Sequence, residues 1–160
     1  MAARQRVLSI AAASGRVGYI LLVDRRIAST GLSRKASNNA DDAAMSVANW
    51  IEQLRPDVVI TERVLKRSKK GQRTRAVITA MAHVAEIADV LDLQVVRGQS
   101  HANKFEEAAE LARDFPEIAH LLPKPRRPWD SEPKATVYFE ALSLALTAIG
   151  GNGQNPTLVA

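Results

Sequence analysis

Residues 58–75 read VVITERVLKRSKKGQRTR, and the character of the sequence changes at one position in this stretch. Residues 58–61 are apolar or β-branched, which is typical of a strand covered on both faces of a sheet. Glu62 ends this run, and the next thirteen residues hold seven Lys or Arg and no acid. The sequence therefore predicts a buried central strand that carries a carboxylate at its C-terminal end, followed directly by a basic loop.

Strands and helices are expected on both sides of this stretch. Apolar spacing predicts three strands first and then alternating helices and strands, with Asn39 as the N-cap of the first helix and Arg55-Pro56 as its end. This order predicts an α/β fold with a mixed five-stranded sheet and helices on both faces. The expected strands are 6–13, 17–24, 25–35, 57–61 and 93–98; the expected helices are 39–54, 74–92, 103–115 and 134–149, with a helical turn at 116–123.

Bulk composition limits the class of protein. The 160 residues suit a single domain over 1–150, followed by a flexible tail over 151–160. There is no cysteine and only three scattered histidines, so any metal is expected to be held by carboxylates. No apolar run is long enough for a membrane span, and no signal peptide is recognisable, so a cytoplasmic protein is expected. The net charge of +5 suits a polyanionic partner.

Three segments resemble the RuvC-type Holliday-junction resolvases of the RNase H-like nuclease superfamily, and the likeness extends over nearly the whole chain in the same order. The segments are LSIAAASGRVGYILL (8–22), RPDVVITERV (55–64) and FEALSLALTAI (139–149). Gly18-Tyr19 matches the pair that opens the second strand of that family. Glu62 matches the acid of its fourth strand, and Glu140 matches one of the acids of its last helix.

The resemblance implies a magnesium-dependent, structure-selective endodeoxyribonuclease, a hydrolase for which manganese can substitute. Two magnesium ions about 4 Å apart can activate water and stabilise the leaving oxygen, and both ions require oxygen ligands. The resemblance makes Glu62 and Glu140 the expected catalytic and metal-binding residues. It also implies a homodimer, because a four-way junction presents two symmetric strands. The Ala-rich stripe of residues 75–91 is the expected contact between the two chains.

Two departures from the family put catalysis in doubt. Ala11 stands where the family has the first-strand Asp, and Val137 stands where it has Asp or His. Neither side chain can coordinate a metal. The sequence leaves three explanations open: a site lost by divergence, substitution by Asp130 or Glu132, or an Ala11 introduced in the laboratory.

Basic residues predict the partner. A cationic loop beside a phosphodiester-cleaving site can neutralise phosphates, which favours nucleic acid over a merely solvated surface. Branched or duplex DNA is favoured, and RNA is possible. The alternative is a non-catalytic interaction module on the same scaffold, in which Ala11 and Val137 close the cleft and the loop serves a protein or RNA partner. The expected nucleic-acid-binding residues are Arg63, Lys66, Arg67, Lys69, Lys70, Arg73, Arg75, Lys104, Lys124, Arg126 and Arg127.

Overall fold

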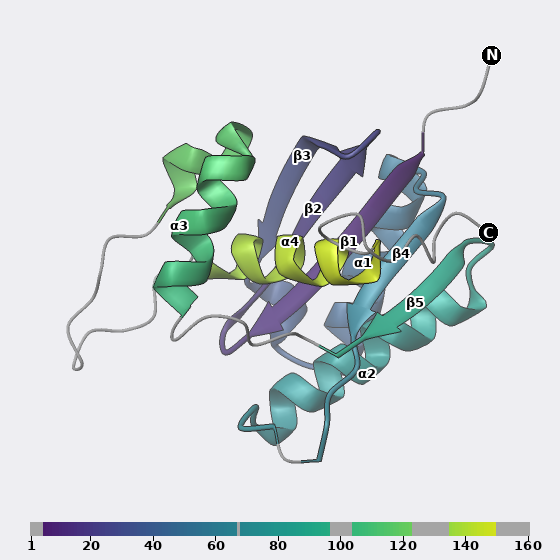
Figure 1. The fold of residues 1–160 in the computed structure, drawn as a ribbon. Coiled ribbons are helices and arrows are strands. Elements are labelled where there is room, and N and C mark those ends of the chain that lie inside the picture. Colours follow the sequence, from purple (N-terminus) through teal and green to yellow (C-terminus); the bar gives the residue numbers. More distant parts are fainter. Residues whose placement is uncertain (1–4, 67, 97–103, 123–134, 150–160) are drawn as a thin grey trace.

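The computed structural model describes residues 5–66, 68–96, 104–122 and 135–149. Its five-stranded sheet has the order β3-β2-β1-β4-β5 (Figure 1). The strands are β1 (Arg6–Ala13), β2 (Arg16–Val23), β3 (Arg26–Ser33), β4 (Val58–Glu62) and β5 (Leu91–Val95). The helices are α1 (Ala40–Leu54), α2 (Gln72–Ile87), α3 (Lys104–Asp114) and α4 (Thr136–Ala148), with short 3-10 turns η1 (Lys35–Ser37) and η2 (Pro116–Leu121). The predicted α/β fold is confirmed.

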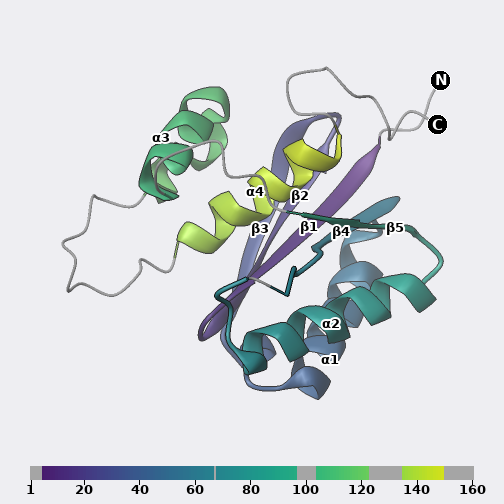
Figure 2. The same cartoon turned by 60° about the horizontal axis from the view of Figure 1, so that its bottom comes forward.

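The sheet separates two layers of helices. Figure 2 shows α3 and α4 on one side of the sheet and α1 and α2 on the other. Side chains of β1 alternate between the two hydrophobic cores, as expected for a strand covered on both faces. Val7 and Ala11 belong to the core under α4, while Leu8, Ile10 and Ala12 belong to the core over α1 and α2. Residues of β1 with odd numbers therefore face α4.

The register of the central strands places two expected site positions together. β1 runs parallel to β4, and Ser9 pairs with Ile60 at the last matched position. Ala11 and Glu62 each lie two residues beyond this pair and face the α4 side of the sheet, because side chains alternate along a strand. β1 also pairs with β2 antiparallel, with Ala11 opposite Gly18.

Two local predictions differ in accuracy. Asn39 is the N-cap of α1, as expected: its Oδ1 accepts a hydrogen bond from the Asp42 backbone N–H at 2.8 Å. The expected helix over 74–92 and the strand over 93–98 are placed too late, because α2 ends at Ile87 and β5 begins at Leu91. The Leu91 N–H donates to the Asp57 carbonyl at 3.1 Å. Pairing with β4 therefore overrides the helical pattern of this segment.

The apolar stripe of α2 packs inside the chain. Its buried residues, Val77, Ile78, Met81, Ala82 and Ala85, lie against the sheet and α1. The expectation that the stripe of residues 75–91 contacts a second chain stays a prediction. The five buried residues are covered within the chain, whereas Ile87 and Leu91, at the end of the stripe, are 72% and 52% exposed. Among the residues that the structure describes, no helix has the length and apolarity needed to cross a membrane. The expected tail over 151–160 lies outside those residues.

Candidate functional site

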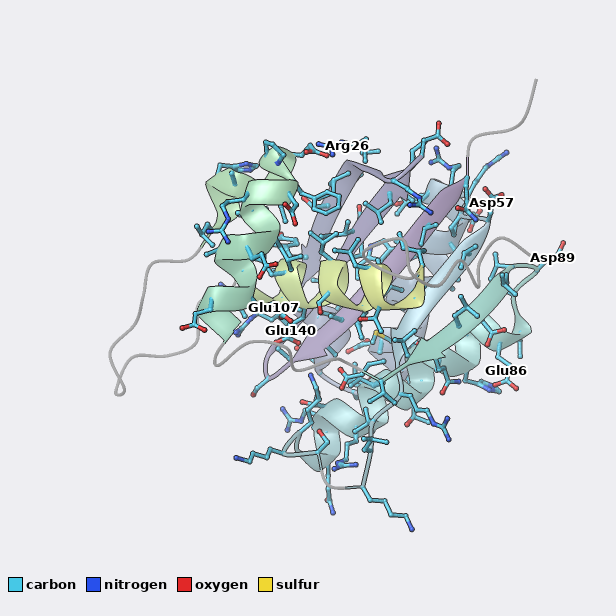
Figure 3. All side chains as sticks on the ribbon, viewed as in Figure 1. Arg26, Asp57, Glu86, Asp89, Glu107 and Glu140 are labelled. Atoms are coloured by element: carbon cyan, nitrogen blue, oxygen red, sulfur yellow. The ribbon has the colours of Figure 1, made fainter. Side chains whose placement is uncertain are left out.

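Glu62 and Glu140 lie around one ammonium group. Lys70 Nζ is 3.4 Å from Glu62 Oε1 and 3.6 Å from Glu140 Oε2. Glu62 is the last residue of β4, and Glu140 projects from α4, which lies over the sheet (Figure 3). Residues far apart in the sequence thus bring two carboxylates to the same end and the same face of the sheet.

Both carboxylates are buried. Glu62 is 8% exposed and Glu140 is 1% exposed. Glu140 is flanked in sequence by Phe139 and Ala141, which are also buried. Removing a charge from water costs several kcal/mol, by order of magnitude, unless another charge or hydrogen bonds compensate it. The ammonium of Lys70 contributes to that compensation as an ion-pair partner of both groups.

Lys70 also reaches the end of β1. Its Nζ donates a hydrogen bond to the Ala12 carbonyl at 2.8 Å. This carbonyl lies beyond the last matched pair of β1 and β4, so strand pairing with β4 does not provide its donor. The ammonium therefore has oxygen neighbours from β1, β4 and α4. The side chain is only 20% exposed.

Hydrogen bonds within the β4–α2 loop position Lys70. Arg75, in the first turn of α2, donates from Nε to the Lys70 carbonyl at 3.0 Å. Its Nη2 donates to the Ser68 carbonyl at 2.7 Å and to the Lys66 carbonyl at 3.2 Å. The Lys70 N–H donates to Ser68 Oγ at 3.2 Å. Arg75 and Lys70, both expected on a nucleic-acid-binding surface, thus have partners within the protein.

Apolar groups fill the positions where the resemblance calls for the other acids. Ala11 is 1% exposed and Val137 is fully buried. A Cβ built on Gly18, the β2 partner of Ala11, would lie only 2.6 Å from Val137 Cγ1. Val137 therefore packs directly on β2 beside Ala11. Ser9 holds α4 in this position, since its Oγ donates to the Ala141 carbonyl at 2.6 Å.

The donor set does not fit a pair of magnesium ions. Magnesium needs near-octahedral oxygen coordination at about 2.0–2.1 Å. Among the described residues, the oxygens that face the Lys70 ammonium come from two carboxylates and the Ala12 carbonyl. No cluster of three or more His, Cys, Asp or Glu capable of holding a metal occurs within the part of the chain that the structure describes. Asp130 and Glu132, the expected substitutes, lie outside that part.

Other expected basic residues fall into two groups. Arg63, Lys66, Lys69 and Arg73 are exposed on the segment that leaves Glu62 and enters α2. Lys104 begins α3, but its side chain lies outside the described structure. Arg67, Lys124, Arg126 and Arg127 lie entirely outside the described structure.

The sequence did not identify two features of the surroundings. One is the inward direction of Lys70, which a run of basic residues does not reveal. The other is Glu107 on α3, a buried acid that accepts a hydrogen bond from Ser143 Oγ at 3.2 Å (Figure 3). Ser143 lies three residues after Glu140, so it shares that face of α4. Burial, and secondarily Tyr19, raises the pKa of the Tyr138 phenol above its usual 10.0.

Comparison with known proteins gives structural matches only. No family model matches the chain, and no curated protein matches it significantly. A structure of Thermus thermophilus RuvC aligns with a TM-score of 0.59 and 18% identity, covering 92% of this chain and 97% of that chain. T. thermophilus RuvC in complex with Holliday junction substrate gives 0.60 and 17%, covering 92% and 96%. Fowlpox virus resolvase in complex with substrate Holliday junction DNA gives 0.59 and 12%, covering 92% and 99%.

These matches extend over nearly the whole of each chain, while the identities are too low to carry an activity across. They agree with the strand order β3-β2-β1-β4-β5 and with helices on both faces of the sheet. The chain therefore has the RuvC-like RNase H fold.

Proposed function

We propose that this chain binds nucleic acid, with branched or duplex DNA as the favoured ligand and RNA as a possible one. The observation that carries the proposal is the convergence of Glu62 and Glu140 at the sheet end from which the basic loop departs. Two structural neighbours are complexes with Holliday junction DNA, which supports a ligand of this class.

The exposed cations of the loop suit a phosphate backbone. Lys66 and Lys69 are exposed between Glu62 and α2, and Arg63 and Arg73 are exposed at either end of this segment. Each phosphate that a Lys or Arg neutralises releases counterions, so affinity gained in this way falls steeply with salt. Contacts of this kind position the ligand without reading base sequence. The proposed binding is therefore salt-sensitive and independent of sequence.

In this proposal the chain binds nucleic acid and does not cleave it by a two-metal mechanism. Ala11 and Val137 bring no ligand, and Lys70 faces the remaining carboxylates. The apolar closure at Ala11 and Val137 favours a second candidate function, a non-catalytic interaction module that binds a protein through the same loop. The two candidates share the surface and differ in ligand, so a binding measurement separates them.

Affinities for a four-way DNA junction, a DNA duplex and a single-stranded RNA, each measured across a salt series, test the proposal. The junction or duplex is expected to bind at low salt, with log affinity falling linearly against log salt concentration. Negligible affinity for all three ligands at low salt would remove nucleic acid and leave the interaction module.

Removing positive charge from the basic loop tests whether this loop forms the nucleic-acid-binding surface. Replacing Lys66 and Lys69 together with Ala is expected to weaken binding and to reduce the salt slope by about two. Arg25→Asn is the matched control, since Arg25 is an exposed cation in the β2–β3 turn at the other end of the sheet. Its φ of 69° also suits Asn. Equal losses in both proteins would place the contact elsewhere.

A two-fold dimer completes the proposal, because a four-way junction presents two equivalent strands. The middle of the stripe of residues 75–91 is buried within the chain, so the proposed contact uses its exposed end. Ile87, 72% exposed at the end of α2, and Leu91, 52% exposed at the start of β5, are apolar positions where a second copy can pack. Molar mass measured with and without junction DNA tests this part, and a monomer in both conditions would contradict it.

A further inference from the structure

We propose that the Lys70 ammonium is a built-in cation that takes the place of a divalent metal between Glu62 and Glu140. The chain then needs no metal to fold or to keep these two carboxylates together. The inference concerns the site described above, but it does not depend on which ligand the basic loop binds.

The first support is the set of contacts around Nζ. An ammonium group has three N–H donors, and this one has three oxygen neighbours. It hydrogen-bonds the Ala12 carbonyl at 2.8 Å and lies 3.4 Å and 3.6 Å from the carboxylates of Glu62 and Glu140. These oxygens come from β1, β4 and α4. One side chain therefore connects the three elements on which the resemblance would place metal ligands.

The second support is the way in which the loop is held. A solvated lysine in an open loop has no reason to point inward. Here Arg75 binds three loop carbonyls, including that of Lys70, and Ser68 Oγ accepts the Lys70 N–H. These bonds fix the backbone from which the Lys70 side chain departs. Arg75 is thus a positioning residue for the ammonium.

The third support is charge. Of the three described groups that meet here, Glu62 and Glu140 carry a formal charge of −2 and Lys70 carries +1. Ala11 and Val137 add no negative charge, so a divalent cation has less to attract it than a site with a full set of acids would offer. A divalent cation beside the ammonium would also be repelled by its like charge. A metal can enter only when the ammonium leaves.

Manganese titration of the native chain and of Lys70→Met tests the inference. Thermal unfolding and calorimetric binding are measured in chelator and then with rising Mn²⁺, at constant ionic strength set with sodium chloride. The melting temperature of the native chain is expected to be the same in chelator and in Mn²⁺. Lys70→Met is expected to melt roughly 5 to 10 °C lower in chelator, because two buried carboxylates lose their cation.

Added Mn²⁺ is expected to restore the melting temperature of Lys70→Met and to bind it at least about tenfold more tightly than the native chain. Lys35→Met is the matched control, since Lys35 is an exposed lysine outside the basic loop. It is expected to behave as the native chain does in both measurements.

Two results would overturn the inference. One is native Mn²⁺ affinity equal to that of Lys70→Met and abolished by Glu62→Gln. The other is a Lys70→Met protein whose melting temperature matches that of the native chain in chelator. If Lys70→Met does not fold, the double variant Lys70→Met/Glu62→Gln removes one carboxylate together with the ammonium and is expected to fold without metal. A double variant that folds only with Mn²⁺ would also overturn the inference.

The test separates this inference from the proposed function. Manganese binding and unfolding are measured without nucleic acid, and the salt series is measured in chelator. If the native chain binds no nucleic acid but Lys70→Met gains a manganese site, the proposed function is contradicted and the inference is retained. A native chain that binds nucleic acid, together with a Lys70→Met variant that gains no manganese site, would retain the proposed function and contradict the inference.

Discussion

The ends of β1 and β4 occupy equivalent places in the sheet but differ in chemistry. The two strands are parallel neighbours, and α4 covers one face of both. β1 ends in three buried alanines and offers only the carbonyl of Ala12. β4 ends in a buried carboxylate, Glu62. Lys70 contacts the ends of both strands. Its ammonium binds a backbone carbonyl on β1 and a charged carboxylate on β4.

The strongest way to break this difference is to give both strands an acid. Ala11→Asp is expected to lower the free energy of unfolding by roughly 3 kcal/mol or more, because it buries a further charge beside two carboxylates that share one ammonium. Urea unfolding in chelator measures the loss. Ala28→Asp, the same change at an exposed position of β3, is the control and should cost far less. Equal stability of Ala11→Asp and the native chain would mean that Ala11 does not lie beside the carboxylates.

The next largest effect concerns the apolar packing beside the end of β1. Gly18→Ala is expected to cost about 1–3 kcal/mol, since its Cβ would meet Val137 Cγ1 at 2.6 Å and a β-branched side chain in a helix adapts poorly. Adding Val137→Ala should recover part of the loss, which a double-mutant cycle measures. Gly71→Ala is the control, because nothing lies within 4 Å of its Cβ position. Additive losses at 18 and 137 would disprove the contact.

A smaller effect tests how β1 is fixed to α4. Ser9→Ala is expected to cost about 1 kcal/mol through loss of the buried hydrogen bond to the Ala141 carbonyl. Chemical unfolding measures this difference. Ser29→Ala is the control, as its Oγ lies 3.5 Å from the Tyr19 hydroxyl and contributes little. A cost at Ser29 equal to that at Ser9 would argue against a special role for the β1–α4 bond.

The smallest effect on global stability belongs to the β4 side. Arg75→Met removes hydrogen bonds to loop carbonyls and is expected to lower unfolding free energy by under about 1 kcal/mol, since exposed loops contribute little to it. The local effect should be larger: amide hydrogen exchange over residues 63–71 should speed up several-fold, by order of magnitude. Arg73→Met, an exposed cation in the same turn of α2, is the control. Unchanged exchange in Arg75→Met would show that Arg75 does not hold the loop.

Sequence patterns predicted what depends on local or repeating order. The N-cap at Asn39 follows from the identity of one side chain and its neighbours, and the mixed sheet with helices on both faces follows from the alternation of elements. The meeting of Glu62 and Glu140 was predicted from their places in a family pattern. The end of α2 and the start of β5 were not predicted correctly. Leu91 joins the sheet by pairing with Val58, a contact that the helical pattern of the sequence does not contain.

The direction of Lys70 could not be predicted for a different reason. Seven basic residues in the loop look alike in sequence, and only the hydrogen bonds of Arg75 and Ser68 distinguish one of them. Its contact with Ala12 also requires knowing where the pairing of β1 and β4 stops. Loop side chains obey no periodicity, so this interaction becomes visible only in three dimensions.

The packing of Val137 on Gly18 has a consequence for how such a site changes over evolutionary time. An acid returned to position 11 alone meets uncompensated charge, an acid at 137 alone loses the apolar contact with β2, and removal of Lys70 alone leaves two buried anions. Each of these three changes is therefore expected to give a less stable protein when it is made alone. The positions are coupled through packing and charge, so a change at one of them should be tolerated best together with changes at the others.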